Sequence, residues 1–326
     1  MDRYLPFIDV QVDGGPVSSA FYARLNTATI TDAPGQDGDT VELTFDDAGN
    51  EIQIPPEGAK LTVQFGFRDA GSWKMGSFIV EKSTIRGGAD GEFVTLSGRS
   101  ADARKDTKEP LSEHFDEITI GGLVGELAKR HGYQAKVSDA LASIVLPYTA
   151  RVNQSTADFL TRLADRHRAL FSIKDGKFLF LTRGQLTAIT IDKGMCESWD
   201  FTVEPRPRHG KTEAGWFERS TGETKFEVFS TGLEGPVKRL RTVFASQGEA
   251  KSAAEAEGDR LGRATASGSL KLAGMPEILA DTPLLLTGFR SEANGAWRAG
   301  TVTHEYGETY ITTVEVDAPE VGRASE

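Results

Sequence analysis

Histidines beside carboxylates are the side chains in this sequence with the widest chemical range. His304 is followed directly by Glu305, and a histidine with a carboxylate can act as an acid–base pair in hydrolysis. The surrounding segment reads as a strand, in which neighbouring side chains point to opposite faces of the sheet. The sequence therefore predicts that His304 and Glu305 do not form a catalytic pair.

Two further histidines each follow a predicted helix and stand next to arginine. These are His131, preceded by Arg130, and His167, flanked by Arg166 and Arg168. The C-terminus of a helix favours a positive charge by roughly 0.3–1 kcal/mol. We interpret His131 and His167 as helix-terminal side chains, with metal binding or catalysis as the alternative.

Paired carboxylates are abundant, as in Asp46-Asp47 and in Glu305 with Glu308. Glycosidases need two carboxyl groups at a set separation, but in an acidic chain neighbouring carboxylates are expected by chance on the surface. Residues 97–100 lack the Gly-x-Ser-x-Gly spacing of a nucleophile elbow. No P-loop is present, and no Gly-x-Gly-x-x-Gly follows a strand. The sequence predicts a protein that is not an enzyme, without catalytic, cofactor-binding or metal-binding residues.

Aromatic side chains and the single thiol have similarly plain interpretations. The four tryptophans lie in β segments and are interpreted as core or interface anchors in preference to a sugar-binding platform: Trp73, Trp199, Trp216 and Trp297. Cys196 is the only cysteine, which excludes an internal disulfide and a cysteine-based zinc site. We expect it to be a free, buried thiol.

Charge and hydropathy narrow the class further. The chain of 326 residues carries 48 acidic and 37 basic side chains, for a net charge of -11. This balance argues against tight sequence-specific binding to a phosphate backbone. The first residues show no signal-peptide pattern, and no run approaches the roughly 20 apolar residues of a membrane-spanning helix. We expect synthesis in a cytoplasm and no membrane insertion.

Residues 1–110 read as a β-domain without a helix. Short β-rich runs alternate with glycine-containing turns, as in a barrel or sandwich. The predicted strands are Phe7–Val12, Ser18–Ile30, Asp39–Phe45, Lys60–Phe67, Gly76–Thr84 and Phe93–Ser97.

Residues 111–186 read as an α+β insert. An apolar stripe predicts a helix over Thr119–Gly132. Ser155 and Asp158 resemble a capping box, which predicts a second helix with Phe159, Leu160 and Leu163 on its buried face. A hairpin should follow, with its turn at Asp175-Gly176.

Residues 187–320 return to strands, with one helix over Ala250–Leu261, and residues 321–326 read as a flexible tail. The predicted strands are Thr187–Ile191, Trp199–Glu204, Thr224–Phe229, Leu284–Gly288, Ala296–Glu305 and Tyr310–Val316. The fold class is therefore mainly β with an α+β insert, in which two tandem β-barrel domains flank a small α+β domain.

Six segments resemble the phage late control gene D proteins, which are tail hubs related to the hub part of VgrG proteins. The most specific is Asn153–Ala164, which is similar to the family pattern Q-x-x-S-D-x-x-F-L-x-R-L-A, although Ser155-Thr156 replaces its Ser-Asp pair. The other segments are Pro56–Gly66, Met75–Val80, Ser97–Asp102, Thr119–Gly132 and Gly295–His304.

The resemblance implies a structural hub of a contractile tail, located in the virion baseplate and made in the cytoplasm of a bacterial host. It implies a homotrimer in which each subunit supplies two tube-like barrels, so that a pseudo-six-fold ring joins the hexameric tail tube to the trimeric spike. The implied partners are the tube protein, the central spike, a tape-measure protein and other baseplate proteins. The alternative is a carbohydrate-active or peptidoglycan-degrading baseplate enzyme.

Charge is divided unevenly along the chain. Residues 1–110 carry a net charge of -7 and residues 187–326 carry -6, whereas residues 111–186 carry +2. If the two β-domains form the ring, its central channel would be lined largely by Asp and Glu. Genomic DNA would then pass without specific binding, because like charges repel over about 8–10 Å at physiological salt. The alternative is that acidity only keeps the protein soluble.

Overall fold

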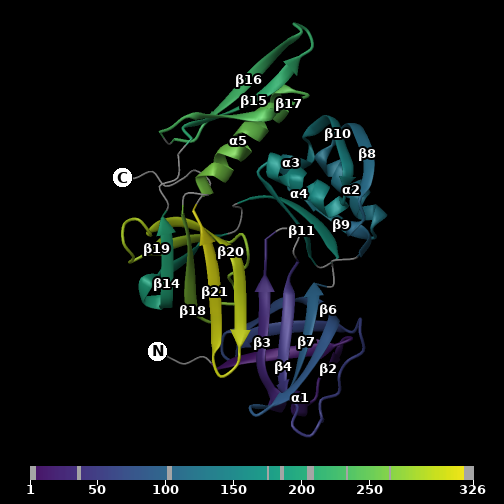
Figure 1. Cartoon of the computed structure of the whole chain (residues 1–326), viewed down its shortest axis with the longest axis vertical. Coiled ribbons are helices and arrows are strands. Elements are labelled where there is room, and N and C mark those ends of the chain that lie inside the picture. The colour runs from purple at the N-terminus through teal and green to yellow at the C-terminus, as the bar shows by residue number, and fades with distance from the viewer. Residues whose placement is uncertain are drawn as a thin grey trace.

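The computed structural model describes residues 5–34, 38–100, 105–174, 176–183, 187–203, 209–232, 234–263 and 266–318. The protein is mostly β, with 56% of residues in strands and 18% in helices, as the sequence predicts. In Figure 1 a large sheet fills the lower half, and an α+β unit and a small sheet with a helix lie above it. Within these ranges no helix has both the length and the apolar character needed to span a bilayer. The predicted tail at 321–326 lies outside the described residues.

The large sheet has 13 strands and is built from both ends of the chain. Its two halves meet where β3 (Leu25–Asp32) pairs antiparallel with β20 (Gly295–Tyr306). The other strands of the first half are β1 (Pro6–Val12), β2 (Gly15–Pro16), β4 (Thr40–Asp46), β5 (Lys60–Phe67), β6 (Gly71–Gly88) and β7 (Gly91–Ser100). The other strands of the second half are β13 (Ile189–Asp192), β14 (Cys196–Val203), β18 (Ala266–Ala273), β19 (Pro283–Thr287) and β21 (Tyr310–Asp317).

Alternating side chains give each half of the sheet its own core. In β5, Leu61, Val63 and Phe65 are fully buried while the residues between them are more exposed, the period-2 pattern of a half-buried strand. The first cluster is made almost entirely by residues before 97, and the second by residues after 190. Tyr310 of β21 packs in the first cluster against Phe65, at 5.3 Å between ring centroids. The two halves are thus joined by side chains as well as by strand pairing.

One sequence expectation for the first half is wrong. The run 18–30 was expected to be a single strand, but it begins with the short helix α1 (Ser19–Arg24) before β3. Phe21 and Tyr22 are adjacent, so they break the alternation that a half-buried strand requires. Both are placed by tertiary contacts: the Phe21 ring lies 4.7 Å from that of Phe45, and the Val10 amide donates to the Tyr22 hydroxyl at 3.1 Å.

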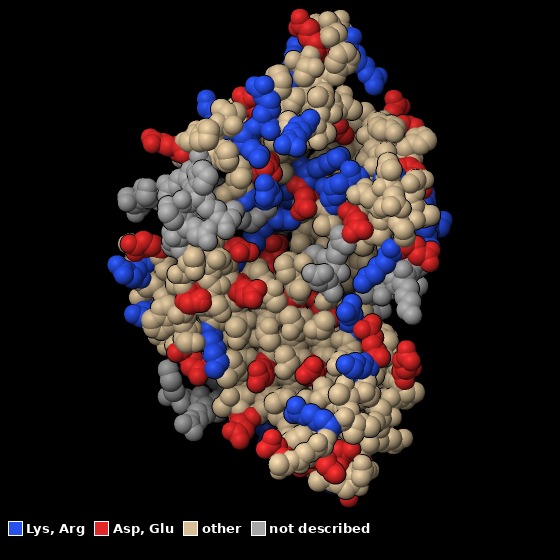
Figure 2. All heavy atoms as spheres, in the orientation of Figure 1, with Lys and Arg blue, Asp and Glu red and all other residues tan. Residues whose placement is uncertain are grey.

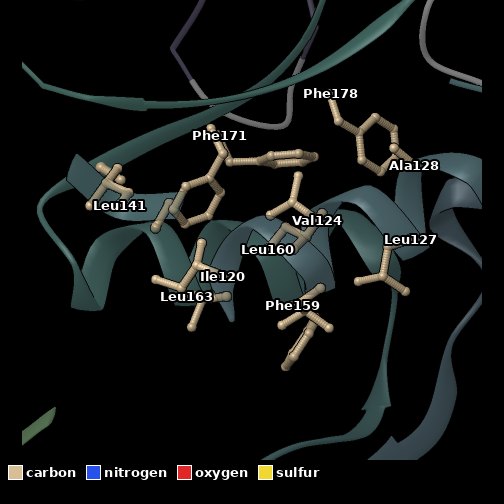
Figure 3. Packing of buried hydrophobic residues seen from close by; sticks show 14 of the residues in the cluster. Ile120, Val124, Leu127, Ala128, Leu141, Phe159, Leu160, Leu163, Phe171 and Phe178 are labelled. Carbon is tan, nitrogen blue, oxygen red and sulfur yellow. The ribbon is translucent and has the colours of Figure 1, made fainter. Parts of the chain in front are cut away.

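The insert folds around a core of its own, shown in Figure 3, where apolar side chains of two helices face each other. Its elements are β8 (Leu111–Thr119), α2 (Ile120–Arg130), β9 (Gln134–Val137), α3 (Asp139–Ala142), β10 (Val145–Gln154), α4 (Thr156–Arg166), β11 (Ala169–Lys174) and β12 (Lys177–Thr182). Strands β8 and β10 pair with each other, and β12 lies between β11 and β9.

Both predicted helices of the insert are confirmed, with their caps. Thr119 Oγ1 accepts the Gly122 amide at 3.0 Å, and Ser155 Oγ accepts the Asp158 amide at 3.0 Å. The Ser155 hydroxyl also donates to the Asp158 carboxylate at 2.7 Å. Such a cap contributes about 1 kcal/mol. The hairpin β11–β12 is present as predicted, although Asp175 of its turn lies outside the described residues.

A fourth unit lies within the region predicted as the second β-domain. Strands β15 (Lys211–Glu218), β16 (Glu223–Ser230) and β17 (Val237–Phe244) form a separate three-stranded sheet packed on α5 (Gln247–Arg263). Figure 1 shows this sheet above the rest of the molecule, with α5 beneath it. Two single 3-10 turns, Lys105–Lys108 and Lys193–Met195, complete the described elements.

Candidate functional site

His304 is a structural side chain deep inside the second half of the sheet. Its Nδ1 lies 3.1 Å from Thr312 Oγ1 and 3.0 Å from the Tyr310 hydroxyl, and its Nε2 lies 3.1 Å from the Ile278 carbonyl. Burial lowers the pKa of His304 to about 4, so the ring is neutral at neutral pH. Glu305 is exposed on the opposite face. The two residues therefore do not face one another, and His304 ties β20 to β21 and to the loop before β19.

The other two histidines considered in the sequence analysis, His131 and His167, lie at the C-terminal ends of the insert helices α2 and α4. His131 Nε2 lies 2.9 Å from Thr156 Oγ1, which links the end of α2 to the start of α4. His167 is buried at the end of α4, and burial followed by the charge of Arg166 lowers its pKa to about 4. The expectation of a helix-terminal cation is therefore wrong for His167, because desolvation outweighs the favourable helix dipole.

The paired carboxylates serve local structure. Asp46 Oδ1 accepts the Ala48 amide at 2.9 Å, and Asp47 Oδ1 accepts the Ile52 amide at 2.8 Å, so this pair shapes a turn. Glu308 is exposed. In the described ranges, no three His, Cys, Asp or Glu side chains are placed to hold a metal ion together.

The tryptophans and the thiol occupy different environments. Trp297 is buried and donates its Nε1–H to the Ala293 carbonyl at 2.8 Å. Trp73 and Trp216 are partly buried against separate cores. Trp199 is exposed on β14, with Lys193 Nζ 4.9 Å from its ring centroid. Cys196 is a free thiol, as expected, but its exposure is intermediate, whereas the sequence analysis predicts a buried side chain.

A buried cluster of charges joins three parts of the molecule, and we call it the Asp32–Lys174 junction. Lys174 Nζ at the end of β11 lies 2.8 Å from Asp32 Oδ1 and 3.4 Å from Asp39 Oδ2. The other oxygen of Asp32 accepts the Ala280 amide at 3.0 Å, from the loop before β19. One lysine of the insert is thereby bonded to the first half of the sheet, and one carboxylate links that half to the second.

The two carboxyl groups of the junction, Asp32 and Asp39, have pKa values shifted in opposite directions. Burial raises the pKa of Asp39 to about 7, with the neighbouring Asp32 charge adding to the effect and Lys174 opposing it. The pKa of Asp32 is lowered: burial acts against ionisation, but Lys174 and hydrogen bonds from Asp39, Lys174 and Ala280 outweigh it. Two carboxyl groups therefore share one lysine, and near neutral pH Asp39 keeps a proton in part of the molecules.

A second joint connects the insert to the small upper sheet. Arg168, which follows α4, forms ion pairs with Glu255 and Asp259 of α5. The Arg168 backbone has a φ of 52°, a conformation that side chains other than glycine rarely adopt. Asp259 is almost fully buried. Removing either Asp259 or Arg168 would therefore lower the free energy of unfolding.

Sequence reasoning missed these joints. In the sequence, Asp32 precedes the predicted turn at Ala33-Pro34-Gly35 and Asp39 begins the predicted strand Asp39–Phe45. Lys174 lies just before the predicted hairpin turn at Asp175-Gly176. The interacting residues are far apart in the sequence, since Lys174 comes 142 positions after Asp32. The one available signal is that each ends or precedes an apolar strand.

The junction predicts a pH dependence of stability. The folded-state pKa of Asp39 is about 7 and its usual value is near 3.8, so the stability it contributes is complete below about pH 4 and is lost as pH rises to about 7. Asn cannot ionise. Asp39→Asn should therefore raise the unfolding free energy at pH 8, relative to wild type, by at least about 1.4 kcal/mol, the equivalent of one pKa unit. At pH 4.5 the effect should be much smaller, because most of the loss occurs between pH 4.5 and pH 7.

The comparison must be made between variant and wild type because other groups titrate in the same window. His167 and His304 have lowered pKa values, so their contribution rises with pH where that of Asp39 falls. Denaturant unfolding at pH 4.5 and pH 8 measures the difference. An equal effect of Asp39→Asn at both pH values would contradict this assignment of the proton.

The sequence was compared with protein families and with known proteins. No protein-family model matches the sequence. The chain is 30% identical to a protein of Escherichia phage 186 named "Probable baseplate hub protein", over 94% of this chain and 91% of that protein. This chain belongs to the phage baseplate hub protein family.

Solved structures agree on the fold. The 43 kDa tail protein of prophage MuSo2 from Shewanella oneidensis matches 97% of this hub protein and 99% of its own length, with a TM-score of 0.75 and 14% identity. The Escherichia coli c3393 protein, a component of the type VI secretion system, matches 97% of the hub protein and 79% of its own length, with a TM-score of 0.56 and 12% identity. The role of this hub protein is structural.

Proposed function

We propose that the hub protein is a homotrimer forming a ring with pseudo-six-fold symmetry. The observation that carries the proposal is the single sheet built from both ends of the chain, whose two halves have separate cores and meet at β3 and β20. Residues 1–110 and 187–320 would each supply one tube-like barrel, with residues 111–186 packed to one side. Three such chains give six barrels, and closed symmetry limits growth to a ring.

The proposed position follows from this symmetry. A ring of six similar barrels presents a six-fold surface to a hexameric tail tube, while its three chains present a three-fold surface to a trimeric spike. We assign the hub protein to the tail baseplate of the virion, after synthesis in the cytoplasm of the bacterial host. The tape-measure protein and other baseplate proteins are its further partners.

We propose that the ring encloses an acidic channel through which genomic DNA passes without specific binding. The net charges of -7 and -6 in the two ring-forming regions support this. On the face drawn in Figure 2, Lys and Arg gather most densely around α4 and α5 above, while Asp and Glu are spread over the sheet strands below together with scattered Lys and Arg. An acidic wall repels the phosphate backbone within about 8–10 Å.

The alternative, a polysaccharide- or peptidoglycan-degrading enzyme, predicts turnover that depends on an acid–base group. We expect purified hub protein to release no product from peptidoglycan, polysaccharide or peptide substrates, because His304 is buried away from Glu305. Product release can be followed by chromatography with lysozyme as the positive control. Turnover that His304→Gln or Glu305→Gln abolishes, while the variant keeps its melting curve, would support the enzyme and contradict the purely structural role.

A further inference from the structure

Exposed apolar side chains concentrate on two of the three small sheets in the described part of the chain. Of sixteen large hydrophobic side chains that are exposed among the described residues, nine lie on β8, β10 and β15–β17: Leu111, Val145, Tyr148, Val152, Phe217, Phe226, Val228, Val237 and Val243. The much larger 13-stranded sheet contributes only a few. Grouped exposed apolar residues mark surfaces that another protein covers.

The first surface is the outer face of the upper sheet, which we call the β15–β17 face. Helix α5 covers the opposite side, where Trp216, Phe229 and Phe244 are packed. Strand alternation places five of the exposed residues together on the uncovered side: Phe217, Phe226, Val228, Val237 and Val243.

The centre of the β15–β17 face is held in place by its neighbours. Phe226 pairs with Gly215, whose missing side chain leaves room for the ring: an added Cβ would lie 3.3 Å from it. The guanidinium of Arg239 lies 4.5 Å from the Phe226 ring centroid and 2.8 Å from Glu213. A fixed aromatic ring beside an arginine is the composition typical of an interface anchor.

The β15–β17 face carries excess positive charge. Lys211 and Arg239 are exposed on the same side by strand alternation and register. Arg241 is exposed two residues further along β17. Glu213 is the acidic residue on that side, and Arg239 neutralises it. A partner would therefore be apolar with an acidic margin.

A second surface of the same chain is apolar and has an acidic margin. It is the outer face of the two-stranded sheet of the insert, which we call the β8–β10 face. Tyr148 and Val152 are 52% and 72% exposed there, and the His114 ring stacks on Tyr148 at 6.0 Å. Asp116 lies 3.5 Å from His114, and the adjacent Glu117 is exposed. The opposite side of this sheet faces the insert core.

We infer that the β15–β17 face of one subunit docks on the β8–β10 face of a second copy of this chain. Both faces are apolar, one has a basic margin and the other an acidic margin, and each lies uncovered on its own subunit. Because the two faces differ, the contact is heterologous. Such a contact closes into a ring when its rotation brings the last subunit back to the first, and the proposed trimer requires closure at three subunits, with each subunit using each face once. The inference rests on the proposed trimer and identifies where its subunits touch.

Disulfide trapping tests the contact directly. In a Cys196→Ser background, Val228→Cys and Val152→Cys should together give a covalently linked trimer on mild oxidation, seen on a non-reducing gel. Each single cysteine variant should stay monomeric on the same gel. A second pair, Phe226→Cys with Tyr148→Cys, allows for a different register. A wild-type trimer by native mass spectrometry with no cross-link from either pair would overturn the docking and leave the proposed ring standing.

Charge insertion gives an independent readout. Val228→Asp places a negative charge against the acidic β8–β10 face, and Val152→Lys places a positive charge against the basic β15–β17 face. Each should lower the trimer fraction at least tenfold in native mass spectrometry and leave the melting curve in place, because both side chains are more than half exposed. Ile85→Asp, on β6 outside both faces, is the control and should keep the trimer.

Mixing the two charge variants separates this contact from a symmetric one. Val228→Asp retains an intact β8–β10 face and Val152→Lys retains an intact β15–β17 face, so one good contact remains and a mixed dimer should form. Trimers in both charge variants would refute the docking. A wild-type protein that is monomeric at every concentration would refute the proposed ring itself, and the docking with it.

Discussion

Leu160→Ala lowers the free energy of unfolding by about 2–5 kcal/mol, the cost of a large-to-small change in a packed core. Leu160 is fully buried. In Figure 3 it lies between α4 and α2, next to Val124. Leu160 shares one core with apolar residues of α2, β11 and β12, so the shortened side chain leaves a cavity in that core.

Denaturant unfolding with a two-state fit measures the loss. Ile85→Ala is the matched control, since Ile85 is exposed on β6 and should change stability by less than about 0.5 kcal/mol. A melting curve that Leu160→Ala leaves in place would contradict the amphipathic assignment of α4.

Lys174→Met lowers the free energy of unfolding by about 2–3 kcal/mol. It leaves Asp32 and Asp39 buried together without their cation. Removing one partner of a fully buried pair costs about 3–5 kcal/mol. We expect the lower value of about 2–3 kcal/mol because the Lys174 side chain is about one-third exposed. Methionine keeps the length of the aliphatic stem, so the loss reports on the charge.

A second substitution distinguishes lost charge pairing from lost packing. Adding Asp39→Asn to Lys174→Met removes one of the two carboxyl groups and should recover part of the stability at pH 8. Lys177→Met, on the exposed start of β12, is the control and should be near neutral. A double variant no more stable than Lys174→Met alone would show that the junction does not depend on its charges.

The sequence predicted the local elements well where one strong pattern decides them. β5 spans Lys60–Phe67 as expected, because its apolar residues alternate without interruption. Helix α4 begins at the cap that Ser155 and Asp158 predicted, because a cap needs only neighbours in sequence. Helix α1 was missed because two adjacent aromatic residues find their partners in other strands.

Long-range features lay beyond local reasoning. The three-stranded sheet with α5 was read as part of one β-domain, because β15 pairs in parallel with β17 across a connection that the local pattern does not mark. The Asp32–Lys174 junction depends on residues brought together only by the packing of the insert against the sheet. His167 was assigned the right place but the wrong charge, since burial is not visible in a residue's immediate neighbours.

A cryo-electron microscopy reconstruction of the purified hub protein tests the central claim most directly. We expect a closed ring of three chains in which the two halves of each 13-stranded sheet form six similar barrels around one bore, with Asp and Glu facing inward. A bore lined by Lys and Arg would contradict the acidic channel. A monomer, or a ring in which each chain contributes only one barrel, would contradict the proposed assembly.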